Sequence, residues 1–225
     1  MLFDLDGTLL DTVEAISAAL NRALAEDGLQ AVPAAQVRRM IGRGAPMLIT
    51  RALAYLGVEL DRADQAQLLQ RYLAHYRDIE AGARSSDALY AGVPECLRVL
   101  DAMGLRLAVV TNKPQQISAG LLQRLGLSAW IGTVIGGDSC QLHKPDPQPL
   151  LLACQSLQVA ADEALMIGDS INDVQAARAA GMPVLCVPYG YNEGNDPREL
   201  PCDGLVETLA DVPGLLTGEW ALPTR

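Results

Sequence analysis

Two carboxylates, Asp4 and Asp6, are the first side chains along the sequence that could do chemistry. They follow the apolar run 1–3, and Gly7 comes directly after them. Residues two apart in a strand point to the same face, so both carboxylates would lie together. Ionised carboxylates side by side repel each other unless a cation lies near them. Gly7 permits a tight turn after the strand, and we expect the acid pair at the edge where open parallel sheets bind ligands.

Groups that can donate hydrogen bonds to an anion follow two other segments. The apolar run 105–110 leads into Thr111, Asn112 and Lys113, whose hydroxyl, amide and ammonium groups suit phosphate oxygens. This triplet alone is equally consistent with the start of a helix. The second of these segments is the loop 143–147, which contains Lys144. The chain has 15 Arg but only 2 Lys, Lys113 and Lys144. Because both lysines fall in these loops and not on exposed helices, we interpret them as anion-binding candidates.

A second pair of acids, Asp169 and Asp173, comes after the apolar run 164–167. Asp173 or Asn172 could cap the following helix, which would be a structural role. Capping does not explain Asp169, which directly follows the predicted strand and Gly168. We therefore expect Asp169 to lie at the same edge of the sheet as the first acid pair.

Acids gathered at one edge of a sheet would be strongly destabilising without a cation. Hard oxygen ligands and the lack of a His or Cys cluster favour Mg²⁺. The sequence thus predicts a Mg²⁺ site formed by Asp4, Asp6, Asp169 and Asp173. Thr111 and Lys144 would neutralise phosphate oxygens beside it, the combination that phosphoryl transfer requires.

Apolar runs and helical patterns alternate through most of the chain. Continuous apolar runs are typical of strands covered on both faces, and Gly126 and Gly181 stand where helix C-terminal glycines belong. This alternation predicts an α/β fold with a doubly wound parallel sheet. The predicted strands are 1–5, 105–110, 133–135, 164–167 and 184–187, and the predicted helices are 93–103, 115–125, 147–157 and 173–180.

The stretch from Thr12 to about Glu80 has helical patterns and no convincing strand. Apolar residues recur there at spacings of three and four over 13–25, 45–56 and 63–79. We predict a small helical domain, residues 12–81, inserted into a core made of 1–11 and 82–225. The segment 81–92 would be the return linker.

Composition restricts the classes of partner. The 225-residue chain has a formal net charge of -10 and no Lys/Arg cluster, so we expect no nucleic-acid partner. No apolar run approaches the roughly 20 residues that cross a bilayer, and acids near the start argue against a signal peptide. The 5 Cys are scattered, as free thiols are in a reducing cytoplasm. We expect a cytoplasmic protein without a membrane partner, either monomer or homodimer.

Taken as a set, the segments at 4–11, 109–114, 143–147 and 168–173 resemble the motifs of the haloacid dehalogenase superfamily. The resemblance covers nearly the whole chain, including the inserted helices. It implies that Asp4 is a nucleophile that becomes an aspartyl phosphate. It also implies that Asp6 is first a general acid and then a base. Dehalogenases of the superfamily lack the second carboxylate, so Asp6 points to phosphoryl chemistry.

The resemblance also implies a set of ligands. Mg²⁺ would be bound by Asp4, by the backbone carbonyl of Asp6 and by Asp169, with support from Asp173. The phosphoryl group of a small phosphate ester would be bound by Thr111, Lys144, backbone amides near Gly7, and Asn112.

Shorter matches resemble bacterial phosphoglycolate phosphatases. They are VVTNKP at 109–114, GGD at 136–138, KPDP at 144–147, DSIND at 169–173 and YGYN at 189–192. The loop 41–44 is similar to a substrate-facing loop of that family, and its Arg43 could pair with a substrate carboxylate. An exposed residue without such a role is an equally good interpretation of Arg43.

Other functions fit the same motifs. A phosphatase for pyrophosphate, a nucleotide or a sugar phosphate would use the same core residues. A phosphomutase would return the phosphoryl group to a bound sugar and would need to exclude water. A binding module that kept the pocket without turnover belongs to another class, and it would bind phosphate without Mg²⁺-dependent hydrolysis.

Overall fold

A six-stranded sheet lies at the centre of the computed structural model, which describes residues 1–82 and 89–218. Every pair of neighbouring strands is parallel, and the strand order is β3-β2-β1-β4-β5-β6. The strands are β1 (Leu2–Phe3), β2 (Leu107–Val110), β3 (Ile131–Ile135), β4 (Met166–Gly168), β5 (Val184–Cys186) and β6 (Gly204–Leu205). The first five confirm the predicted strands, whereas β6 is too short for its sequence pattern to indicate it.

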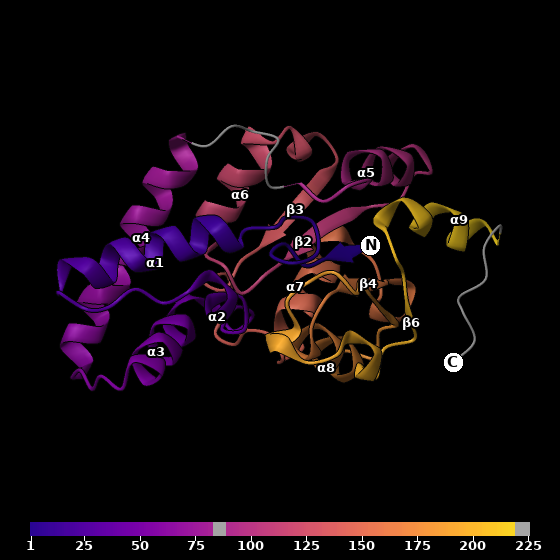
Figure 1. The fold of residues 1–225 in the computed structure, drawn as a ribbon. Coiled ribbons are helices and arrows are strands. Elements are labelled where there is room, and N and C mark those ends of the chain that lie inside the picture. The colour runs from indigo at the N-terminus through magenta and orange to yellow at the C-terminus, as the bar shows by residue number, and fades with distance from the viewer. Residues whose placement is uncertain (83–88, 219–225) are drawn as a thin grey trace.

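Helices cover both faces of this sheet (Figure 1). Successive strand residues point to opposite faces, so Phe3 packs in one apolar cluster and its neighbour Leu2 in the other. The cluster of Phe3 includes residues of α5 (Val93–Ala102) and α6 (Gln115–Arg124), and that of Leu2 includes residues of α7 (Gln148–Leu157) and α8 (Ile171–Ala179). The predicted doubly wound α/β fold is therefore confirmed.

Four further helices lie between β1 and α5 in the sequence, beside one end of the sheet (Figure 1). They are α1 (Val13–Glu26), α2 (Ala34–Arg38), α3 (Gly44–Leu56) and α4 (Arg62–Gly82), and α1 packs mainly along α4. Three were predicted, whereas α2 is too short to show a helical period. The division into domains at 12 and 81 stays a prediction, and residues 83–88 of the expected return linker lie outside the described part of the chain.

The remaining elements are short. They are η1 (Leu127–Ala129), η2 (Ala161–Glu163), η3 (Asn192–Gly194), η4 (Pro197–Glu199), η5 (Leu209–Asp211) and α9 (Val212–Thr217). Gly126 and Gly181 follow α6 and α8 with positive φ, as expected for helix ends. Across 1–82 and 89–218, no helix combines the length and the apolar character that crossing a membrane would require.

The strand order reverses beside β1. The chain passes from β1 to β2 and β3 on one side and to β4, β5 and β6 on the other. Loops on the two sides diverge at such a switch point, and this leaves a crevice at the carboxyl ends of the strands. Asp4 follows β1 and Asp169 follows β4, so the topology alone brings these two carboxylates to the crevice.

Candidate active site

The chain coils tightly directly after β1. The carbonyl of Leu5 accepts hydrogen bonds from the amides of Leu9 (3.0 Å) and Leu10 (2.9 Å). Gly7 has a φ of +89°, and a Cβ at this position would overlap the carboxylate of Asp169. The Gly7 amide donates to the Leu10 carbonyl at 2.8 Å. Gly7 thus forms the turn expected of it, but its amide is engaged within that turn.

Three of the four predicted acids meet at the carboxyl ends of β1 and β4. Asp4, Asp169 and Asp173 are buried, and each offers an oxygen that lies within 4.8 Å of the other two. The side chain of Asp6 is outside this group. Three hard oxygen donors at this spacing fit a divalent cation of the Mg²⁺ type.

Lys144 joins two of these carboxylates. Its Nζ lies 2.8 Å from Oδ1 of Asp4 and 2.7 Å from Oδ1 of Asp173. The other oxygen of Asp173 accepts from the backbone amide of Ser170 (3.1 Å) and from its hydroxyl (2.7 Å). Asp173 therefore caps α8 and holds Lys144 at once. The cap also explains why α8 begins at Ile171, earlier than predicted.

Asp169 is oriented by two donors from distant parts of the sequence. Its Oδ2 accepts from the backbone amide of Tyr191 at 2.6 Å, and its Oδ1 accepts from the hydroxyl of Thr8 at 3.3 Å. The Tyr191 hydroxyl in turn accepts from the amide of Thr12 at 2.7 Å and donates to Asp11 at 2.9 Å. These contacts fix the position of Asp169 relative to the turn after β1.

The electrostatics of this cluster favour an added positive charge. Burial raises the pKa of Asp4 to about 7 against the opposing charge of Lys144. Burial also raises the pKa of Asp169 well above its ordinary value, and the charge of Asp173 adds to this. Burial lowers the pKa of Lys144, but Asp173 and Asp4 outweigh it and raise that pKa. A divalent cation would supply the charge that one lysine does not.

The predicted phosphate ligands Thr111 and Asn112 border the same cavity as Asp4. The Thr111 hydroxyl accepts from the amide of Lys113 at 3.2 Å, so its own hydrogen remains for a ligand. The Asn112 amide nitrogen donates to the carbonyls of Gly42 (3.0 Å) and Lys144 (2.8 Å), and thereby ties the inserted segment to the core. Its oxygen is buried and has no hydrogen-bond partner among the described residues.

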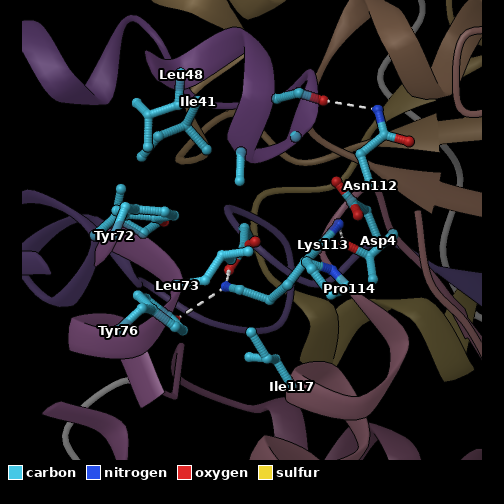
Figure 2. Close-up of a pocket in the computed structure, with 16 residues that line it drawn as sticks. Asp4, Ile41, Leu48, Tyr72, Leu73, Tyr76, Asn112, Lys113, Pro114 and Ile117 are labelled. Atoms are coloured by element: carbon cyan, nitrogen blue, oxygen red, sulfur yellow. Dashed lines mark hydrogen bonds and ion pairs between the residues drawn. The ribbon is translucent and has the colours of Figure 1, made fainter. Parts of the chain in front are cut away.

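A cavity lies between these core residues and the inserted helices (Figure 2). Its volume is about 50 Å³, room for a few water molecules. Asp4, Asp6, Thr111 and Asn112 line it from the core. The opposite wall is largely apolar and includes Ile16, Ile41, Ala45, Leu48, Tyr72, Leu73 and Tyr76.

Lys113 also reaches this cavity, a placement that the sequence did not assign. Its Nζ forms an ion pair with Oδ1 of Asp6 and donates to the hydroxyl of Tyr76 at 3.0 Å. The Thr12 hydroxyl donates to the same Asp6 oxygen at 2.6 Å. The rarity of lysine in this chain had singled out Lys113, but its partners come from distant residues and leave no local pattern.

Arg43 lies away from the cavity that contains Asp4. Its Nε donates to Oε1 of Glu193 at 2.8 Å, and its side chain is 43% exposed. Arg51 pairs with the same oxygen at 3.0 Å. Arg43 borders a neighbouring cavity that Lys144 also lines, and its contact with a substrate carboxylate stays a prediction.

Comparisons with known proteins identify the family of this chain. Residues 1–187 match the model of the family described as haloacid dehalogenase-like hydrolase. A phosphoglycolate phosphatase from Nitrosospira multiformis is 42% identical over 96% of this chain and 94% of its own. A phosphoglycolate phosphatase from Rhodospirillum rubrum is 47% identical over 85% of this chain and 80% of its own.

Solved structures show the same fold. A protein described as a "predicted phosphoglycolate phosphatase" from Haemophilus somnus is 30% identical, with a TM-score of 0.88 over 96% of both chains. A β-phosphoglucomutase from Clostridium difficile, at 17% identity and a TM-score of 0.79 over 97% of this chain and 94% of its own, shares the fold alone. The chain belongs to the haloacid dehalogenase-like hydrolase family.

Proposed function

We propose that this chain is a Mg²⁺-dependent phosphatase that converts 2-phosphoglycolate into glycolate and phosphate through a phosphorylated Asp4. Its family and its relatives make it a phosphoric monoester hydrolase. The observation that supports the mechanism most is the environment of Asp4. This carboxylate ends the central strand, contacts Lys144, and lies with two further carboxylates at the mouth of the sheet.

The reaction proceeds in two steps. An oxygen of Asp4 attacks phosphorus, a new O–P bond forms, and the ester O–P bond breaks. Asp6 gives its proton to the departing alkoxide. Water then attacks phosphorus and forms a new O–P bond, Asp6 takes up a proton from that water, and the bond between the Asp4 oxygen and phosphorus breaks. Phosphate leaves, and both carboxyl groups return to their starting states.

Other residues of the chain hold the phosphoryl group during these steps. The ammonium of Lys144 and the hydroxyl of Thr111 would bind its oxygens, as charge moves onto them in the transition state. Asn112 would add its amide group. Asp4, Asp169 and the backbone carbonyl of Asp6 would hold Mg²⁺, with support from Asp173. The ion would supply positive charge that offsets the negative charge of the carboxylates and the phosphoryl group.

The substrate assignment is supported by the cavity and the relatives. The cavity beside Asp4 has a largely apolar wall and a few charged groups, as small-ligand sites do. Relatives named phosphoglycolate phosphatase cover most of this chain. We also propose that residues 12–81 act as a cap over the core of 1–11 and 82–225, and that they exclude bulk water from the reaction.

A panel of phosphate esters tests the proposal. We expect purified protein to release phosphate from 2-phosphoglycolate faster than from pyrophosphate, a nucleotide or a sugar phosphate, and only with Mg²⁺. Transfer of phosphate to a second sugar hydroxyl without release would instead identify a phosphomutase. Phosphate binding without turnover of any ester would contradict the proposal.

A further inference from the structure

The cavity that contains Asp4 has a cation of its own. Among the described residues that line it, Lys113 is the one with a positive side chain, since neither Lys144 nor Arg43 borders this space. Lys113 is 8% exposed. Figure 2 shows its side chain extending from the core toward Tyr76 on the wall formed by α4. A buried ammonium in an otherwise apolar region requires negative partners.

The contacts of Lys113 leave part of its bonding capacity for a ligand. A lysine ammonium has three N–H groups. One is directed to Asp6 and a second to the hydroxyl of Tyr76, whose ring the nitrogen also approaches at 4.6 Å from the centroid. The third N–H has no hydrogen-bond partner among the described residues, and the Lys113 side chain borders the cavity.

The ammonium groups of Lys144 and Lys113 therefore lie in two separate parts of the site. Lys144 contacts Asp4 and Asp173, where the phosphoryl group would be transferred. Lys113 lies on the side of Asp6, the proposed acid for the leaving group. An ester whose phosphate sits at Asp4 and whose bridging oxygen faces Asp6 would point its remaining atoms toward Lys113 and the apolar wall.

We propose that Lys113 binds a carboxylate on the leaving group, and that it selects small phosphate esters with a second negative charge. This inference rests on the proposed function and assigns its substrate preference to a core residue. An ammonium suits this task because a charge-assisted hydrogen bond in a buried site is stronger than a neutral one. The apolar wall opposite would reject polar groups that lack a partner.

The test compares two substrates that share one skeleton. Ethyl phosphate carries a methyl group where 2-phosphoglycolate carries its carboxylate. We expect wild-type protein to prefer 2-phosphoglycolate in kcat/KM. In Lys113→Met this preference should fall by about 10- to 100-fold, mainly through a higher KM for 2-phosphoglycolate. Arg62→Met removes an exposed charge from the start of α4 and serves as the matched control; its preference should equal that of wild type.

Three results would overturn the inference. One is equal kcat/KM of wild-type protein for the two substrates. Another is an equal loss on both substrates in Lys113→Met, which would confine the lysine to orienting Asp6. The third is a loss of preference in Arg43→Gln together with a retained preference in Lys113→Met.

Two measurements keep the inference testable if Lys113→Met does not fold. The wild-type preference needs no variant. Tyr76→Phe removes the hydroxyl that anchors the Lys113 ammonium from α4, and we expect it to reduce the wild-type preference for 2-phosphoglycolate over ethyl phosphate. Either a wild-type protein without the preference or a Tyr76→Phe variant with the full wild-type preference contradicts the inference. No hydrolysis of either ester by wild type would instead refute the proposed function.

Discussion

The carboxyl end of the sheet and the surface of the inserted helices hold their charges in opposite ways. In the core, Lys144 is 2% exposed and lies between Asp4 and Asp173. On the inserted segment, Arg43 is 43% exposed and pairs with Glu193 of the loop after β5. Buried pairs are costly to break, whereas exposed pairs contribute little. The difference indicates that the core fixes the reacting groups, and that Arg43 of the inserted segment can change its contact with Glu193 at small cost.

The largest effect should follow from replacing the nucleophile in the core. Asp4→Asn keeps the shape of the side chain but cannot form the ester bond to phosphorus. We expect kcat for 2-phosphoglycolate to fall by about 10⁴-fold or more. The fold should persist, because one buried carboxylate is removed from a cluster of three. Appreciable multiple turnover in this variant would rule out Asp4 as the nucleophile.

The next largest effect should be on the stability of the core network. Lys144→Met leaves Asp4 and Asp173 without their buried cation. We expect the free energy of unfolding to fall by about 3–5 kcal/mol, as measured by urea denaturation at pH 8 without metal. Arg62→Met again provides a control for charge, with an expected change near zero. A loss below about 1 kcal/mol would remove the contrast between core and surface pairs.

Metal binding should stabilise the core in a pH-dependent way. The pKa of Asp4 is raised from 3.8 to about 7, so proton uptake stabilises the metal-free fold at low pH, and this contribution is lost as the pH rises through 7. Mg²⁺ competes with that proton. At a concentration of 100 times Kd it should add about 2.7 kcal/mol, or about 5–10 °C in Tm, at pH 8.

At pH 5.5, the same Mg²⁺ concentration should raise the Tm clearly less than it does at pH 8. Asp4→Asn should weaken this dependence, since it removes a titrating ligand. Equal Mg²⁺-induced shifts at pH 5.5 and pH 8 in wild type would contradict a metal site built on carboxylates with raised pKa values.

The smallest effect should come from the exposed pair. Arg43→Gln removes one of the two guanidinium partners of Glu193, while Arg51 keeps its contact with that carboxylate. We expect the free energy of unfolding to fall by less than about 1 kcal/mol, and this difference to shrink further in 1 M salt. A loss as large as that of Lys144→Met would show that the inserted segment is fixed as firmly as the core.

Much of the core could be predicted from the sequence because its signals are local. The strands at 107–110, 166–168 and 184–186 are continuous apolar runs, and the polar residues that follow them stand at the edge of the sheet. The turn at Gly7 was expected from a glycine after a strand, and its φ of +89° agrees. Parallel strands necessarily bring their carboxyl ends together, so Asp4 and Asp169 met as expected.

The contacts between core and inserted helices could not be predicted in this way. The pairs Lys113–Tyr76 and Arg43–Glu193 join residues 37 and 150 positions apart, and no sequence period encodes such contacts. Asp173 shows a different limit. Helix capping and a place in the acid cluster looked like alternatives for Asp173 from the sequence, but one oxygen of its carboxylate caps α8 and the other contacts Lys144. The strand β6 and the helix α2 are too short for a recognisable pattern.

In the proposed mechanism, the carboxylate of Asp4 carries the phosphoryl group during turnover. The most direct measurement is acid quenching of the enzyme while it hydrolyses 2-phosphoglycolate, followed by borohydride reduction of the acyl phosphate and mass spectrometry of the peptide that contains Asp4. We predict reductive conversion of Asp4 in wild-type protein and none in Asp4→Asn or without substrate. Hydrolysis at full rate without any modification of Asp4 would contradict the account.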